Sequence, residues 1–514
     1  MYSLTFLSAQ QLAKDEEAAC TMLESMPQIM YNILFKVAFR ENKKKLLCEL
    51  VKMWPYSQLK FQALMQICWS CSLTSKRCPE CRANLPNSES SINKIDAIVF
   101  GVISLMRKAI MDDSQQLPNR RLQQLDMTGL VNQNIWWNLK VMRLWACSIS
   151  RAQLYVSSQQ RHDPQSQTRD QEANASPVTT FPKEMCVELL ADLHVSSSSK
   201  KFLKEAFSEN ADSPLHLKCR DLYTTDFIDH DFGQLLSLLD PLTIRRVDLN
   251  YSKIILNDIG WFLSQITTFQ NLQSLKLPSF SEQEIEKMNS IPTLVDILAA
   301  ELSKLKHLRE ICVHSLCLSD QVENLLRDLP CSLQSLQLSF CSLTKKDLIY
   351  LAHSQHSTHL IKLDLAGNKL TELDSFLKLL KSASNSLKWL NVTKCGIKDS
   401  DFYETLPYLY SCVRLSHLGL HGNPLSSGNM LLFLKSCEHK LPNLKIISVP
   451  IFLDCYRDHS HHVGFPRLLG SRLDTGKFGS VLNEMKQMQI TRGDSAIEVI
   501  TSFAFEVGDY FDLQ

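Results

Sequence analysis

Four cysteines in the first hundred residues have the spacing of a metal site. Cys68 and Cys71 form one C-x-x-C pair, and Cys78 and Cys81 form a second pair after a gap of six residues. Two such pairs offer four thiolates, the tetrahedral ligand set that structural zinc prefers. The gap is short for a zinc ribbon, so two alternatives stay open: a structural zinc site, or four unliganded thiols. No other cofactor is predicted.

The sequence contains none of the common catalytic signatures. The G-x-x-x-x-G-K-[ST] loop, the G-x-S-x-G elbow, the G-x-G-x-x-G turn and the H-E-x-x-H motif are all absent. These chemistries need their residues at fixed spacings, because the reacting groups must converge on one point. We therefore expect a protein that is not an enzyme.

Charge and hydropathy exclude two further classes of protein. The 514 residues include 55 Lys and Arg against 54 Asp and Glu, which gives a net charge of +1. Nucleic-acid binding needs a surplus of positive charge, so no nucleic-acid partner is expected. No run reaches the roughly 18 consecutive apolar residues that span a bilayer, and residues 1–17 lack the order of a signal peptide. These features predict a cytoplasmic protein without a membrane segment, whose cysteines are thiols.

A leucine repeat predicts the elements that position any site. Four segments match L-x-x-L-x-L-x-x-N/C-x-L at every fixed position, and they begin 27, 27 and 28 residues apart, at Leu333, Leu360, Leu387 and Leu415. The alternating leucines predict a short strand whose leucines point inward. The Asn or Cys at the ninth position predicts a turn in which the side chain satisfies backbone groups.

Weaker copies extend the array. They begin at Leu122, Ile244, Leu272, Leu308 and Leu444. Apolar residues at helical spacing follow the strand pattern, as in the segment from Phe376 to Leu380. The sequence therefore predicts an α/β leucine-rich-repeat solenoid, a horseshoe with a parallel sheet on its concave face and helices on its convex face.

The repeats divide the chain into three regions. Residues 1–120 show helical periodicity and predict an N-terminal cap over the core of the array. Residues 121–450 hold the repeats, and a polar stretch without aromatic residues near 157–180 predicts a mobile loop. Residues 451–514 predict a C-terminal cap.

Several short strings, together with the cap and the array, resemble a known family. The strings are Phe6-Leu7-Ser8, Leu34-Phe35-Lys36-Val37-Ala38-Phe39, Trp54-Pro55, Leu125-Asp126-Met127-Thr128-Gly129-Leu130 and Asp454-Cys455-Tyr456. With them the sequence resembles the PRAME family of intracellular leucine-rich-repeat proteins over nearly its whole length. The resemblance implies a substrate receptor of a cullin-2 ubiquitin ligase, which docks elongin B, elongin C and cullin-2 through two N-terminal boxes. For one branch of the family it implies a cytosolic negative regulator of Toll-like-receptor and NF-κB signalling that binds the inhibitor-of-κB kinase.

Two segments fit the boxes that the resemblance implies. The elongin-box residues are Leu4, Ser8 and Leu12, with serine where the family prefers cysteine. The cullin-2-box residues are Met26, Pro27, Met30 and Leu34, with methionine at two positions where leucine is usual. The i, i+4 spacing places such residues on one face of a helix, and proline suits a helix start. The alternative, that both segments form the core face of the cap, stays open.

Side chains between the inward leucines are candidates for binding a partner. We expect exposure on the concave face for Gln337, Lys362, Asp364, Lys388, Trp389, Asn391 and His417. Trp389 is either a solvent-facing hot spot or a side chain packed against a neighbouring strand. The sequence thus favours a noncatalytic scaffold that binds proteins, either as an inhibitor of the kinase or, alternatively, as the receptor of a ligase.

Overall fold

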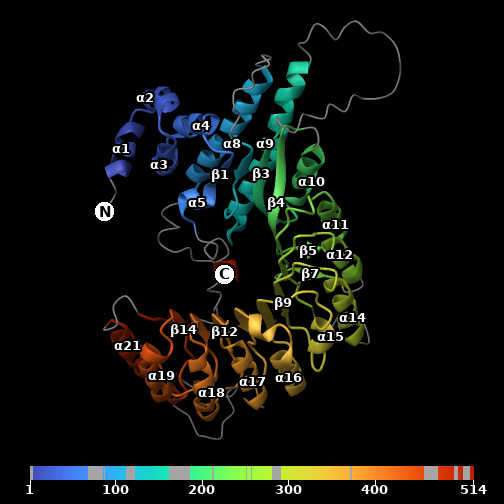
Figure 1. Ribbon diagram of the computed structural model, residues 1–514, viewed down its shortest axis with the longest axis vertical. Coiled ribbons are helices and arrows are strands. Elements are labelled where there is room, and N and C mark those ends of the chain that lie inside the picture. Colours follow the sequence, from blue (N-terminus) through green and yellow to red (C-terminus); the bar gives the residue numbers. More distant parts are fainter. Residues whose placement is uncertain are drawn as a thin grey trace. The chain divides into compact units, whose positions relative to one another are not determined.

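The computed structural model describes most of the chain as two compact units. The described residues are 4–67, 85, 87–111, 122–160, 186–210, 213–250, 252–255, 258–280, 291–370, 373–456, 473–490, 496–501 and 510–513. Unit 1 spans Met1–Arg246 and unit 2 spans Val247–Gln514. In unit 2 helices alternate with short parallel strands, whereas unit 1 begins with helices and carries longer strands (Figure 1).

Unit 1 begins with helices and continues into a parallel sheet. Its helices are α1 (Leu4–Ala13), α2 (Glu16–Met22), α3 (Gln28–Arg40), α4 (Lys44–Lys52), α5 (Phe61–Met65), α8 (Glu89–Met111), α9 (Ile135–Gln160), α10 (Lys200–Glu209) and α11 (His230–Ser237). Its strands are β1 (Gln58–Lys60), β2 (Gln124–Asp126), β3 (Val187–Val195), β4 (Leu215–Thr224) and the short β5 (Phe227–Ile228). Strands β1 to β4 lie in chain order and pair in parallel.

A cluster of aromatic side chains joins the first helices. Phe35 and Phe39 on α3 meet Phe61 edge to face, with ring centroids 6.4 and 5.2 Å apart. Phe35 also contacts Trp54 at 5.7 Å. All four rings are buried. Each such pair contributes on the order of 1 kcal/mol beyond its burial, so the cluster fixes α3 against α5.

Unit 2 repeats one strand and one helix. Its helices are α12 (Ile259–Ile266), α14 (Ile291–Leu302), α15 (Val322–Leu326), α16 (Lys345–His353), α17 (Leu373–Ala383), α18 (Asp399–Ser411), α19 (Ser427–Lys440), α21 (Thr475–Ile490) and α22 (Tyr510–Leu513). Its strands are β7 (Lys253–Ile254), β8 (Ser274–Lys276), β9 (Glu310–His314), β10 (Ser335–Ser339), β11 (Lys362–Asp364), β12 (Trp389–Asn391), β13 (His417–Gly419), β14 (Ile446–Ser448) and β15 (Glu498–Ile500), while β6 (Arg246–Asp248) lies at the boundary of the units. Strands β8 to β15 pair in parallel, with α16 to α19 on the other side of the repeats (Figure 1).

Equivalent leucines are in register from strand to strand. Leu336 on β10 pairs with Leu363 on β11, and Leu390 on β12 pairs with Leu418 on β13. All four side chains are fully buried. The α/β leucine-rich-repeat solenoid that the sequence predicts is confirmed.

The ninth position of the repeat works as the sequence predicts. The Asn368 amide nitrogen donates to the carbonyls of Leu338 (2.7 Å) and Leu365 (2.9 Å). Its side-chain oxygen accepts the backbone N–H groups of Cys341 and Leu343, both at 3.1 Å. The buried asparagine thereby supplies partners to backbone groups that no strand satisfies.

The regions at the two ends of the array differ in part from the predicted caps. Strand β1 lies within residues 1–120, so this region is not wholly helical, and β15 extends the sheet into residues 451–514. Strands β3 and β4 lie in a part of the chain where the leucine pattern predicts no repeat. Residues 157–160 of the predicted loop form the end of α9, and residues 161–180 lie outside the described part of the chain.

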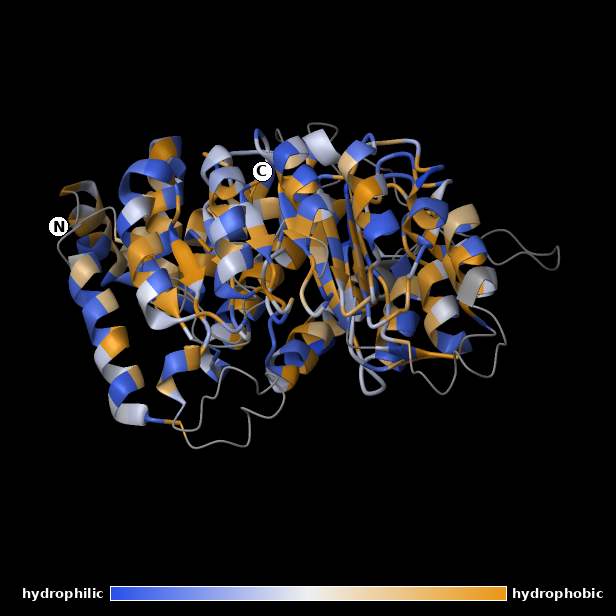
Figure 2. Cartoon of the chain, turned by 90° about the horizontal axis from the view of Figure 1, so that it is seen from below, coloured by the Kyte–Doolittle hydropathy of each residue, from blue (hydrophilic) through white to orange (hydrophobic). Residues whose placement is uncertain are grey.

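No helix among the described residues has the length and apolarity needed to cross a membrane. Figure 2 shows hydrophilic and hydrophobic residues mixed along the helices. Each helix therefore has polar residues beside the apolar ones that pack inward.

Candidate partner-binding surface

The residue just before each of the strands β8 to β14 contributes to one continuous row, which we call the leading edge. Its members are Gln273, Arg309, Gln334, Ile361, Lys388, Ser416 and Lys445. Backbone bonds fix their spacing: the N–H of Gln334 donates to Arg309 (2.8 Å), and that of Ile361 donates to Gln334 (2.7 Å). The backbone groups of these residues are paired with the neighbouring repeats. Their side chains form a row at the N-terminal ends of the strands.

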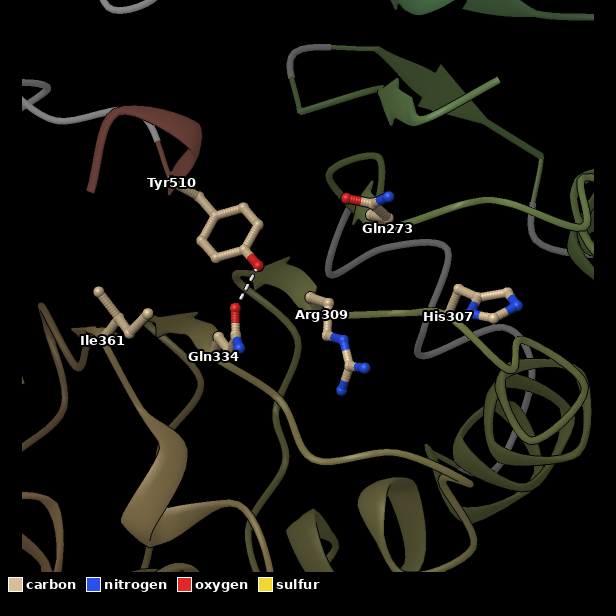
Figure 3. Close-up of a pocket in the computed structure, with 6 residues that line it drawn as sticks. All are labelled: Gln273, His307, Arg309, Gln334, Ile361 and Tyr510. Carbon is tan, nitrogen blue, oxygen red and sulfur yellow. Dashed lines mark hydrogen bonds between the residues drawn. The ribbon is translucent and has the colours of Figure 1, made fainter. Parts of the chain in front are cut away.

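A hollow of about 450 Å³ lies along this edge. It is lined by Gln273, His307, Arg309, Gln334, Ile361 and Tyr510 (Figure 3). Five of these six residues come from the repeats, and Tyr510 comes from α22. Figure 3 shows the Tyr510 ring directed at Gln334, with Arg309 next to Gln334 and His307 farther from the tyrosine. The hollow is mainly polar, which suits a peptide backbone or polar side chains.

Helix α22 lies against the leading edge. The Tyr510 hydroxyl donates to the Gln334 side-chain oxygen at 2.5 Å (Figure 3). The Lys388 ammonium group donates to the backbone carbonyl of Leu513. The Leu513 side chain packs on Trp389, and the isoleucines that pack against this pair are Ile361, Ile446 and Ile500. The sequence did not predict these contacts. The only signal for them was the apolar character of the end of the chain.

Trp389 is 2% exposed, so the packing alternative for this residue is correct. Besides Leu513, it contacts the Lys362 ammonium group on the neighbouring strand, which lies 4.7 Å from the ring centroid. A cation at this distance interacts favourably with the indole face. The Trp389 side chain is therefore the buried surface on which α22 packs, and not a solvent-facing hot spot.

Most of the other predicted residues are also covered. Gln337, Lys362, Asp364 and Asn391 are buried, so the expectation that they are exposed is wrong. Neighbouring strands lie only about 4.8 Å apart, so long side chains on one face cover one another. Asn391 donates to both carboxylate oxygens of Asp364, at 3.2 Å each. Lys388 and His417 remain half-buried.

A buried carboxylate anchors the same face. Glu310 on β9 is fully buried and accepts hydrogen bonds from Ser274 (2.5 Å), Ser335 (2.9 Å) and Gln337 (3.1 Å). Three hydrogen bonds thus satisfy the oxygens of this buried side chain. Gln337 is thus held by Glu310, and its role is to support the face.

His417 is uncharged at neutral pH. Burial, with a smaller effect of Lys445 and Lys362, lowers its pKa to about 4. Its Nδ1 lies 2.8 Å from the Ser416 hydroxyl group. His417 therefore presents a neutral ring beside the basic residues of the leading edge.

The first box lies on α1 and the second runs from just before α3 into it; these two helices of unit 1 pack together. Leu4 and Ser8 are exposed on α1, and Leu12 is half-buried. The core of α1 is formed instead by Ala9 and Ala13. The first box therefore does not form the core face of α1.

The second box is divided between surface and core. Pro27 is the N-cap residue of α3, just before the first helical residue, and its side chain is exposed. Met26 and Met30 are half-buried, whereas Leu34 is completely buried. Leu34 thus belongs to the core, and the other three residues are accessible.

The predicted zinc ligands Cys68, Cys71, Cys78 and Cys81 lie outside the described residues. Within the described ranges no group of three or more His, Cys, Asp or Glu side chains is arranged to hold a metal ion. The zinc site stays a prediction.

Comparison with known proteins identifies related sequences over both units. The family models for the PRAME N-terminal and C-terminal domains match residues 3–75 and 184–468. The chain is 32% identical to leucine-rich repeat-containing protein 14 of Xenopus laevis over 497 residues, 95% of this chain and of that protein. It is also 32% identical to the Homo sapiens protein of that name over 520 residues, 100% of both chains. PRAME family member 20 of Homo sapiens is 24% identical over 435 residues, 82% of this chain and 81% of that protein.

Proposed function

Because the chain belongs to the PRAME family, we propose that it is a noncatalytic scaffold that restrains Toll-like-receptor and NF-κB signalling by binding the inhibitor-of-κB kinase. The observation that carries this proposal is the full-length similarity to leucine-rich repeat-containing protein 14. Stacked repeats that present side chains along one face suit the capture of a folded protein. In this proposal unit 2 supplies the binding surface, and the leading edge contributes half-buried side chains and the exposed Lys445 to it.

Co-precipitation from cytosolic extract tests the proposal. Kinase subunits should co-precipitate with the chain, and phosphorylation of the inhibitor of κB should fall while the amount of kinase stays constant. Lys388→Ala, on the leading edge, should weaken this capture. Lys435→Ala, exposed on α19, is the matched control and should bind normally. Capture without any kinase subunit would contradict the proposal.

A second function is favoured by an exposed apolar surface in unit 1. Leu4 and Leu7 on α1 are 81% and 49% exposed, and Ile29 on α3 is 71% exposed. Large exposed apolar side chains on packed helices commonly mark a protein-binding site. We propose, as the alternative, that this surface docks elongin B, elongin C and cullin-2, so that the chain is the substrate receptor of a ubiquitin ligase.

The paired substitutions Leu4→Ala and Pro27→Ala test this alternative. Both side chains are exposed, so the fold should be retained. Elongins and cullin-2 should co-precipitate with the original chain and be lost from the variant, while a partner bound by unit 2 stays. Gln11→Ala, also exposed on α1, is the control. A captured kinase whose amount is unchanged, with no ligase subunit, would contradict the receptor role and leave the inhibitor role.

A further inference from the structure

Helix α22 contacts the repeats of unit 2 as a ligand would contact a receptor. One contact is a side-chain hydrogen bond from Tyr510 to Gln334, at 2.5 Å. Another is a bond from the Lys388 ammonium group to a backbone carbonyl, that of Leu513. The third is apolar, between Leu513 and Trp389. Short peptide segments are recognised by features of this kind. Here they are the hydroxyl group of Tyr510, a backbone acceptor, and an aliphatic side chain three residues after the tyrosine.

The repeats are complete without this helix. The backbone N–H groups of Gln334, Ile361 and Lys388 all donate to the preceding repeat, at 2.8, 2.7 and 2.8 Å. The leucines of the strands are buried on the opposite face, toward the helices of the repeats. Helix α22 therefore covers a surface that the solenoid has already formed.

The covered surface extends beyond α22. The hollow of about 450 Å³ continues past Tyr510 to Arg309, His307 and Gln273 (Figure 3). This is room for several residues of a longer segment, because pockets of a few hundred Å³ hold small ligands. The site is thus larger than the helix that occupies it.

Charge indicates what kind of segment fits. The leading edge carries three cations, Arg309, Lys388 and Lys445. The sequence around α22, from Glu506 to Gln514, contains three acidic residues and no basic one. Opposite charges of this kind favour association and orient it.

We propose that α22 is an intramolecular ligand, and that the surface it covers binds an acidic segment of a partner protein with a tyrosine three residues before a leucine or isoleucine. The partner segment and α22 exclude each other. The proposal deepens the proposed function and rests on it, because it names the chemistry that unit 2 recognises. A partner must displace α22, so its affinity depends on how firmly Tyr510 and Leu513 are held.

A labelled peptide tests the exclusion directly. The probe is a fluorescein-labelled peptide with the sequence of residues 506–514, and binding is followed by fluorescence anisotropy. A segment in the same chain competes at an effective concentration on the order of 1 mM, so the full chain should bind the probe weakly. A chain that ends at residue 509 should bind it at least about tenfold more tightly. Equal affinity for both chains, or no binding to either, would overturn the proposal.

Two further variants guard against a shortened chain that misfolds. Leu513→Ala in the full chain removes only the apolar anchor, and it should raise probe affinity as the deletion does. It should also expose Trp389 and so increase the quenching of tryptophan fluorescence by acrylamide. Because the chain has seven tryptophans, Trp389→Phe is the control, and this second substitution should abolish the increase. In the shortened chain, Lys388→Ala should lower probe affinity, whereas Lys435→Ala should not. The same affinity in these two variants would contradict the assigned contacts.

The peptide assay contains no cellular partner, so its outcome is independent of the kinase experiment. If kinase capture is seen but the deletion leaves probe affinity unchanged, this inference fails and the proposed function stands. If the deletion raises probe affinity while no kinase is captured, the intramolecular ligand stands and the kinase proposal fails.

Discussion

Arg220 donates two hydrogen bonds to Asp192 inside unit 1, at 3.0 Å to Oδ1 and 3.1 Å to Oδ2. The backbone N–H of Gly129 donates a third, at 2.5 Å. Even so, burial of Asp192 outweighs the effect of Arg220 and raises the pKa of the carboxyl group to about 6. The folded chain therefore takes up a proton at a pH where an unfolded aspartate stays ionised.

Replacing Asp192 by asparagine should change how stability depends on pH. A folded-state pKa raised above the unfolded value contributes stability that is fully present below pH 3.8 and is lost as the pH rises through about 6. Between pH 7.5 and pH 5 the original chain should gain about 1 kcal/mol relative to Asp192→Asn. Urea unfolding at several pH values measures the difference. Parallel pH profiles for the two chains would contradict the assigned pKa.

His417 should have the opposite effect in the same pH range. Its folded-state pKa of about 4 lies below the usual 6.5, so its contribution is present above pH 6.5 and is lost as the pH falls through 4. His417→Gln should remove up to about 3 kcal/mol of this acid-induced loss. Unfolding of the original chain and the variant between pH 7 and pH 4 tests it. The expectation fails if the two chains lose stability equally.

Asn368→Ala should destabilise unit 2 strongly. The substitution leaves the N–H groups of Cys341 and Leu343 and the carbonyl of Leu338 without their side-chain partner in a buried turn. Each unsatisfied buried group costs about 1–3 kcal/mol, so a loss of at least about 3 kcal/mol is expected. Asn324→Ala, at an exposed position on α15, should change the free energy of unfolding by less than about 0.5 kcal/mol. Denaturant titration of both variants makes the comparison, and equal losses would be incompatible with the assigned role.

Two glycines should respond in opposite ways to alanine. Gly367 has a φ of +73°, and an added Cβ would lie 2.2 Å from the Phe340 ring. Gly367→Ala should therefore cost about 1–3 kcal/mol. Gly428, in helix α19, has no atom within 4 Å of an added Cβ, so Gly428→Ala should be neutral or stabilise by roughly 0.5 kcal/mol. Thermal unfolding compares the pair, and the same sign for both would refute the backbone argument.

The sequence predicts the repeats because their signal is local. Strands β10 to β13 lie where the four complete copies of the pattern begin, and the ninth-position asparagine performs its predicted role. The family resemblance, which short strings carry, is also confirmed. Strands β3 and β4 were missed although Val187, Leu189 and Ala191 alternate with less buried residues. Those strands do not follow the leucine spacing, and alternation alone is a weak signal.

The binding surface was less predictable because its contacts are distant in sequence. Tyr510 and Gln334 are 176 residues apart, and Lys388 and Leu513 are 125 apart. A pattern read along one strand cannot show that a remote helix covers it. Burial of Lys362 and Asp364 depends likewise on side chains of adjacent strands. Positions could thus be assigned to a face, but their exposure could not.

The asparagine bonds give the solenoid a direction. Asn368 holds the turn that contains Cys341, and Asn423 holds the turn that contains Cys395, in each case one repeat earlier in the chain. Each turn is therefore finished only when the following repeat has folded against it. Local unfolding of a repeat that carries one of these asparagines removes the bonds that hold the turn before it, so we expect unfolding to spread from there toward lower residue numbers.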